Sequence, residues 1–350
     1  MLPDWAPNIH PLVVHFPLAL LVVAVAFDLL AFALRRWTWL RPAAVGLYVL
    51  GGVGAVLAYV TGLQAADGLR IPAEVEPFLT EHADLGWWTM AFFGTYAAVR
   101  LGAAAYEKTR ERAAVQGVLC AIGLAGLFLL WETGAHGGQM VYRYGVGVAA
   151  AETRAATAAP QASGEVGLVR SDDGWTWTPQ SPAAWTQRMQ WMGNPSGELR
   201  TRLVDTEDAG QVLSLRMERA GALLFVVPDT LGDVQAEAVF DASGFDGTLM
   251  LVHHVQDTQN YDFLAVSGTT VQLGRVQQGE RTTFDEGTFE ADGWIAVRAT
   301  ADGDHFRGYV NDTMVAHGHA APLPPGRVGL RLEGQGPILL RRMQARALGE

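Results

Sequence analysis

The sequence has 350 residues, a formal net charge of -11 and one cysteine. The acidic balance and the absence of a basic stripe exclude a nucleic-acid-binding protein, and a lone Cys120 excludes an internal disulfide. An apolar, Gly/Ala-rich first half and a polar, Gly-punctuated second half predict separate domains. We expect a transmembrane domain over 1–148, a linker and Trp-rich connector over 149–204, and a β domain over 205–350.

Four apolar segments in the first half each approach the ~20 residues that a bilayer-spanning helix needs. They run from about Pro11 to Leu34, Ala43 to Leu63, Ala83 to Ala104 and Ala114 to Gly134. The first segment lacks a basic N-terminal flank and is followed by three more, so we expect a span rather than a cleaved signal peptide. The pattern predicts an α-helical four-helix bundle in a lipid bilayer.

Basic residues concentrate in two of the loops between these segments. The first and third loops carry Arg35, Arg36, Arg41, Lys108, Arg110 and Arg112, whereas the second holds Arg70 among acidic residues. Because basic loops stay in the cytoplasm, we expect a multi-pass protein of the inner (cytoplasmic) membrane with both termini periplasmic.

Histidines lie at the periplasmic ends of the expected spans. His10 and His15 open the first span, His82 begins the third, and His136 follows the fourth. In a regular helix His10 and His15 are separated by about 140°, so they cannot point to one spot. We expect His15 to face the bundle and His10 to cap the helix start or face water.

His15, His82 and His136 are therefore candidate cofactor ligands from three helices, with His10 a weaker candidate. Such a set could hold a b-type haem or a transition metal such as zinc or copper. No CxxCH or HExxH motif accompanies it. The alternative is that these histidines only form hydrogen bonds at the membrane interface, so the cofactor stays unknown.

A second polar pair is expected deeper in the bundle. Asp28 and Arg100 follow His10 and His82, respectively, by the same eighteen residues in two parallel helices. An intramembrane carboxylate needs a partner or must be neutral. We predict a structural Asp28–Arg100 ion pair between the first and third spans.

The second half begins with an Ala/Thr/Ser-rich stretch over 149–164, typical of a linker. The tryptophans that follow are candidates for packing or for stacking on sugars: Trp175, Trp177, Trp185 and Trp191. From about Gln211, short alternating runs separated by Gly, Asp, Asn and Pro predict an all-β, antiparallel sandwich.

The β domain offers carboxylates and histidines but no ExDxxE-type run of a glycosidase, so we expect a binding module and no enzyme. Neighbouring residues of a strand face opposite sides, which predicts that His253 and His254 cannot share a site. His317 and His319 are two residues apart and can share one face.

Two resemblances add to these predictions. The motifs HPLVVHFPLAL at 10–20 and VYRYGVG at 141–147 resemble an uncharacterised bacterial four-helix membrane family over about 8–148. Members occur alone or fused to cytochrome c-like domains, so the resemblance implies a redox or respiratory neighbourhood. This chain has Gln139 and Met140 where the family often has a small or acidic residue and leucine, and no cytochrome c domain is attached.

The second half is similar to concanavalin-like jelly rolls of the glucanase-like type. The motifs that carry the similarity are NYDFL at 260–264, GWIAVR at 293–298, FRGYVND at 306–312 and PGRVGL at 325–330. They specify fold more than chemistry, because related domains bind sugars, proteins or other partners.

The sequence thus predicts a non-enzymatic subunit of a larger electron-transfer complex, respiratory or photosynthetic, with or without its own haem or metal. Its partners would be other membrane-complex subunits, contacted through the spans and the periplasmic sandwich. The alternative is a membrane-tethered carbohydrate-binding module with no redox role.

Overall fold

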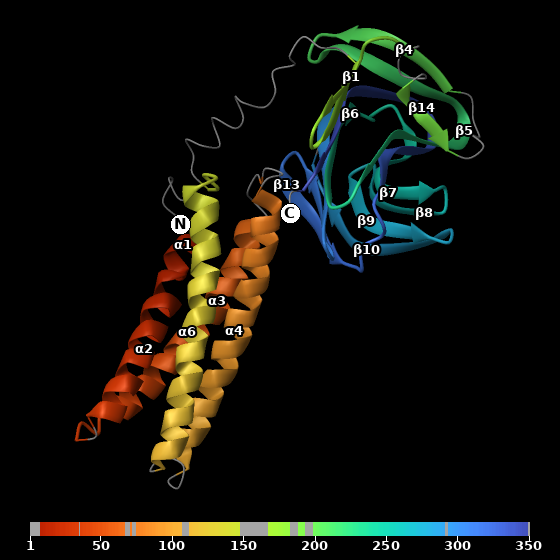
Figure 1. Ribbon diagram of the computed structural model, residues 1–350. Helices are drawn as coiled ribbons and strands as arrows, with labels where there is room; N and C mark the ends of the chain where they lie inside the picture. The colour runs from red at the N-terminus through yellow and green to blue at the C-terminus, as the bar shows by residue number, and fades with distance from the viewer. Residues whose placement is uncertain are drawn as a thin grey trace. The chain divides into compact units, whose positions relative to one another are not determined.

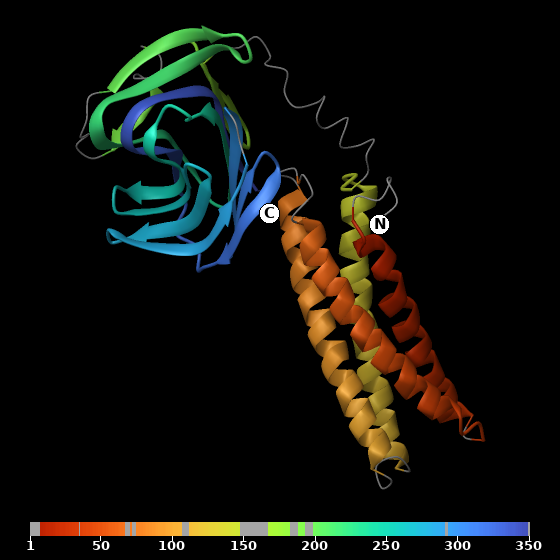
Figure 2. The same cartoon turned by 180° about the vertical axis from the view of Figure 1, so that it is seen from behind.

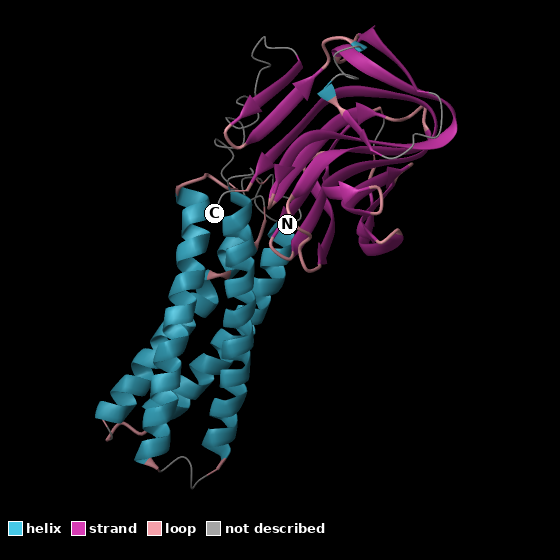
Figure 3. Ribbon diagram, turned by 45° about the vertical axis from the view of Figure 1, so that its right-hand side comes forward, coloured by secondary structure: helices cyan, strands magenta, loops and turns pink. Residues whose placement is uncertain are grey.

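The computed structural model describes residues 8–34, 36–66, 71, 75–106, 112–147, 167–182, 188–192, 199–290 and 293–348. The chain forms two compact units: a helical unit of residues 1–68 and 78–153, and a β unit of residues 69–77 and 154–350. Figure 3 shows that helix and strand segregate between them. The expected fold class, a helical N-terminal region followed by an antiparallel β domain, is confirmed.

The helical unit is a bundle of long helices that run side by side in Figures 1 and 2. Its described helices are α1 (His10–Val13), α2 (His15–Ala33), α3 (Leu40–Ala66), α4 (Glu76–Ala105) and α6 (Ala113–Tyr142). Among the residues that the structure describes, three stretches are long and apolar enough to cross a membrane: His10–Ala33, Leu40–Ala66 and Ala113–Tyr142. The expected third span, Ala83 to Ala104, falls in α4, which is as long but carries Glu81, Asp84 and Arg100, so a count of four spans is not shown.

The first span is interrupted at Val14, between α1 and α2. Pro17 has no N–H and cannot bond to the carbonyl of Val13, which weakens the helix at this turn. The Pro17 ring is buried against α3, where a Cβ on Gly54 would lie 3.2 Å from Pro17 Cδ. Leu21 packs against Gly51 in the same way, because a Cβ on Gly51 would lie 2.5 Å from Leu21 Cδ2. Glycines of α3 therefore let α2 approach closely.

The β unit is built from antiparallel strands. They are β1 (Gly167–Ser171), β2 (Gly174–Thr178), β3 (Gln190–Met192), β4 (Leu199–Thr206), β5 (Gly210–Leu231), β6 (Val234–Asp241), β7 (Asp246–Asp257), β8 (Asn260–Ser267), β9 (Thr270–Gln277), β10 (Glu280–Thr288), β11 (Trp294–Asp302), β12 (His305–Val310), β13 (Thr313–His319) and β14 (Gly326–Ala347). The main path through the sheet is β10-β9-β8-β7-β14-β6-β11-β12-β13.

The long strand β14 connects two parts of this sheet. Its first half pairs with β7 and with the second half of β5, whereas its second half pairs with β6 and β2. The register shifts between Gly334 and Gly336, whose φ angles of +152° and +109° favour glycine. We call the part made of β3, β5, β14, β7, β8, β9 and β10 the front sheet. The main apolar core packs against its inner side and against β6, β11 and β12.

The β domain begins earlier than the expected boundary at 205. β1 and β2 form a hairpin, β2 pairs with β14, and β3 and β4 pair with β5, so the Trp-rich connector is part of the domain from Gly167 onward. The expected linker over 149–164 lies outside the described residues.

Two of the connector tryptophans are buried in the core and are not available to stack on a sugar. Trp175 and Trp177 are 1% and 2% exposed in the main core, and Trp191 lies edge-on to Phe225. Trp185 lies outside the described residues.

The β unit also includes a short segment, residues 69–77, from the connection between α3 and α4. The Glu76 carboxylate accepts hydrogen bonds from Arg298 at 3.3 Å, Arg307 at 3.1 Å and the Tyr309 hydroxyl at 3.2 Å. Arg298 also donates to the Ile71 carbonyl at 2.9 Å. Side chains of β11 and β12 thus hold this segment by buried, charge-assisted hydrogen bonds.

Candidate functional site

His10 and His15 take the opposite orientations to those expected. His10 Nδ1 lies 3.0 Å from the Ala58 carbonyl of α3, and its ring centroid is 6.4 Å from that of His82. His15 is exposed and its Nδ1 faces the carbonyl of Pro11 in the preceding turn. The reason is local space: a Cβ on Gly62 would lie 3.1 Å from His10 Cε1, so this glycine makes room for the His10 ring.

The other two predicted histidines are held by hydrogen bonds. His82 Nδ1 lies 3.0 Å from the Thr133 carbonyl, and His136 Nδ1 lies 2.9 Å from the Glu132 carbonyl. His136 Nε2 also faces Glu81 at 3.2 Å. Among the described residues, no group of three ligand side chains within 4.8 Å lies in the helical unit. Haem or metal binding by His15, His82 and His136 therefore stays a prediction that this geometry does not support.

The deeper polar pair has the predicted partners. Arg100 donates to both carboxylate oxygens of Asp28, at 2.6 and 2.7 Å, and the two side chains are 2% and 6% exposed. The Arg100 guanidinium also lies 5.0 Å from the Tyr48 ring centroid, at cation–π distance. The pair links α2 to α4. Its burial and its neighbouring aromatic ring are typical of an ion pair that stabilises packing between helices.

The β unit contains a buried polar network. It includes a contact between His253 and His254, which strand alternation had led us to exclude. His254 has a φ of +51°, so its side chain leaves the strand alternation and comes within 3.1 Å of His253. His254 also faces Asp262 at 3.1 Å, and Arg275 donates to Asp262 at 2.6 Å. The rule that neighbouring strand residues diverge is wrong here because the ladder is irregular after His253.

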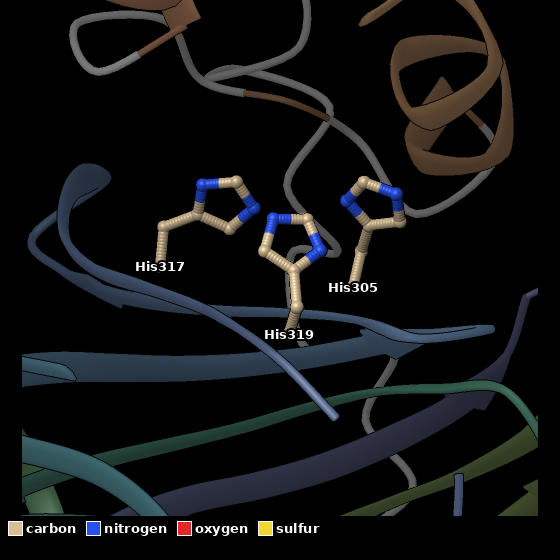
Figure 4. Close-up of side chains that lie close together, drawn as sticks. All are labelled: His305, His317 and His319. Carbon is tan, nitrogen blue, oxygen red and sulfur yellow. The ribbon is translucent and has the colours of Figure 1, made fainter. Parts of the chain in front are cut away.

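A second cluster lies on the β12–β13 hairpin and contains the pair predicted to share a face. His317 and His319 are joined by His305, which lies directly opposite His319 in the strand register. Ring centroids are 4.5 Å apart for His305 and His319 and 4.8 Å for His317 and His319. Figure 4 shows the three rings side by side. The spacing of His317 and His319 was visible in the sequence, whereas only strand pairing brings in His305.

The outward side of the front sheet carries a cross-strand row of side chains. Arg331 lies opposite Met250, which lies opposite Ala265, and the row continues to Gln272 and Glu286. Residues directly opposite one another share a face, so the row spans four strand-to-strand steps, or about 19 Å.

The polar side chains of this face form what we call the polar strip: Arg331, Glu333, Gln272, Glu286 and Arg281. Arg331 donates to Glu333 at 2.6 Å. Gln272 donates to Glu286 at 2.7 Å and accepts from Arg281 at 3.0 Å. Arg281 and Glu286 are exposed, and the other members are partly exposed. The strip therefore presents donors and acceptors in two groups, each held by its own hydrogen bonds, with the buried Met250 and Ala265 between them.

Apolar side chains lie beneath the strip. Tyr261 and Phe263 belong to a buried cluster on this side of the front sheet. The Arg331 guanidinium lies 5.7 Å from the Tyr261 ring centroid, and that of Arg281 lies 4.5 Å from the Phe263 centroid. Because the arginines cover the rings, any ligand of this face would meet polar groups first.

Residues 6–150 match the model of a family described as a predicted membrane protein (DUF2231). The expected resemblance of the N-terminal region to a membrane-protein family is thereby confirmed. No curated protein sequence matches the chain.

Solved structures similar to the β unit include a carbohydrate-binding module, CBM66, from Bacillus subtilis, with 17% identity, a TM-score of 0.36, and coverage of 45% of this chain and 100% of that one. A Bacillus subtilis protein of unknown function with a galectin-like fold has 13% identity, a TM-score of 0.40, and coverage of 52% and 96%. A Bacillus licheniformis β-glucanase has 13% identity, a TM-score of 0.36, and coverage of 51% and 99%. Such similarities assign no ligand or activity to this chain.

Proposed function

We propose that this protein is anchored in the cytoplasmic membrane with both termini on the periplasmic side, and that its β unit binds a carbohydrate without transforming it. The anchoring is supported by the three candidate spans and by the family match. The orientation is supported by the basic loops, although Arg35, Lys108 and Arg110 lie outside the described residues.

The polar strip is the observation that carries the carbohydrate proposal. Sugar hydroxyls both donate and accept hydrogen bonds, so their binding site needs both kinds of partner. Guanidinium groups supply donors only, carboxylates supply acceptors only, and the Gln272 amide supplies both. Two arginines and two glutamates balance one another in charge, which suits a neutral ligand better than an anion or a cation.

The arrangement of the strip also favours an extended ligand. The row from Arg331 to Glu286 spans about 19 Å at normal strand spacing. Hydrogen bonds within the strip hold its side chains before a ligand arrives, which reduces the entropy lost on binding. We infer an oligosaccharide rather than a single small sugar. A role as a subunit of an electron-transfer complex stays a prediction that no contact described above favours.

Glycan-array binding of the full-length chain in mild detergent tests the proposal. The wild type is expected to retain at least one class of neutral glycan, and Arg331→Ala and Glu333→Gln are expected to weaken that binding about tenfold or more, because each removes a charge-assisted hydrogen bond. Arg341→Ala, an exposed change on the same strand outside the strip, serves as the matched control. No retained glycan, or equal retention by all four proteins, would refute the carbohydrate proposal.

A further inference from the structure

The histidine cluster on the β12–β13 hairpin lies on strands that contribute nothing to the polar strip. His305, His317 and His319 each offer a ring nitrogen within 4.8 Å of the other two. Strand alternation directs His317 and His319 to the same side, and cross-strand pairing adds His305. The hairpin thus preassembles three imidazoles without help from loops.

One of these nitrogens is buried without a hydrogen-bond partner among the described residues. His317 Nε2 has this position, while the His317 backbone N–H is fixed by Asp285 at 2.9 Å. Leaving a polar atom buried and unsatisfied is unfavourable, so such an atom calls for an explanation such as an ion.

One charged side chain lies beside the cluster, because Arg307 is directly opposite His317 in the strand register. The positive charge of Arg307 would oppose a cation, but the Glu76 carboxylate lies 3.1 Å from Arg307 and compensates it.

We propose that His305, His317 and His319 form a binding site for a divalent transition-metal ion, with zinc as its representative. Imidazole nitrogens suit zinc, copper and nickel, whereas magnesium and calcium prefer oxygen ligands. Zinc–nitrogen bonds of about 2.0–2.1 Å require the rings to turn inward slightly from their present spacing. Three histidines leave a fourth position for water or another ligand.

A nearby carboxylate is placed to support the site. Asp304 Oδ1 lies 3.6 Å from His305 Nε2, slightly beyond hydrogen-bond distance, so a small turn of the ring would join them. Carboxylates that hold the second nitrogen of a ligating histidine orient the ring and raise its basicity. We therefore infer that Asp304 positions His305 for coordination through its other nitrogen.

Titration of the tag-free, chelator-treated full-length chain with Zn²⁺ by calorimetry tests the site, and Co²⁺ absorption provides a second readout. We expect one ion per chain. His319 is exposed, so His319→Ala should fold normally yet bind at least tenfold more weakly, with loss of the cobalt spectrum. Asp304→Asn should weaken binding by about 10-fold or more through the ring it orients.

Thr313→Ala changes an exposed residue of the same strand and should bind like the wild type. Absence of saturable Zn²⁺ binding by the wild type would overturn the proposal, as would unchanged affinity in both His319→Ala and His317→Ala. Glycan binding is measured separately, so failure of one proposal is distinguishable from failure of the other.

Discussion

Asp28 and Arg100 show how a single buried pair constrains the helical unit. Asp28→Asn would leave the Arg100 guanidinium, 2% exposed, without its counter-charge. We expect the free energy of unfolding in detergent to fall by about 3–5 kcal/mol. Glu81→Gln changes a contact with His136 in which Glu81 is 60% exposed and should cost less than about 1 kcal/mol. Equal losses in denaturant unfolding of the two variants would contradict this account.

His253 gives the β unit a dependence on pH. Burial, followed by the influence of His254, lowers the pKa of His253 from 6.5 to about 3. Below pH 6.5 the His253 side chain is protonated in the unfolded chain but stays neutral in the native protein. The contribution of this group to the free energy of unfolding is therefore complete above pH 6.5 and is lost progressively toward pH 3. The decline reaches about 1.4 kcal/mol per pH unit for this group.

His253→Phe tests that dependence, because a phenyl ring can keep the stacking on Phe306 and cannot titrate. We expect the free energy of unfolding of metal-free protein to fall less steeply with decreasing pH than in the wild type. His317, with a pKa of about 4, should preserve part of the slope. The same slope in variant and wild type, measured by denaturant unfolding at several pH values, would rule out this role of His253.

At the scale of elements, long patterns were predictable and short ones were not. The apolar runs located α2, α3 and α6, and alternation with Gly and Asp turns located β5 to β9, β11, β12 and β14, but not β10 and β13. β1 to β3 were missed because they have only three to five residues each, and because the pairing of β2 with β14 and of β3 with β5 joins distant parts of the sequence. β4 was missed although it forms a hairpin with β5. Pairing partners are invisible to local periodicity.

The candidate sites likewise divide into those that local residue spacing predicts and those that it does not. The Asp28–Arg100 pair follows from equal spacing along parallel helices, and His317 and His319 follow from strand alternation. The orientation of His10 depends on the space above Gly62, and the contact of His253 with His254 depends on a left-handed φ. Both are tertiary features that residue spacing does not encode.

Close packing of α6 gives a prediction for an element. A Cβ on Gly126 would lie 2.3 Å from Phe92 Cε1 and 2.8 Å from Phe93 Cζ on α4. Gly126→Ala should therefore destabilise the bundle by about 1–3 kcal/mol through overpacking, despite the better helix propensity of alanine. Gly94→Ala, which meets nothing within 4 Å, should be neutral or stabilising in the same thermal assay. A loss of stability in Gly94→Ala that is absent in Gly126→Ala would contradict the packing argument.

At the scale of the whole molecule, the chain combines an apolar helical unit with a β unit that presents polar groups. The helical unit holds three candidate spans, whereas the exposed chemistry lies in the polar strip and in the histidine cluster of the β unit. The division supports a protein in which one unit anchors and the other binds.

The most direct test of this account is the equilibrium affinity of the full-length protein for a neutral oligosaccharide retained on the array. The account predicts saturable binding with one site per chain, an affinity reduced about tenfold or more by Arg331→Ala, and an unchanged affinity in Arg341→Ala. Saturable binding that Arg331→Ala and Glu333→Gln leave unchanged would contradict the assignment of the polar strip as the ligand site.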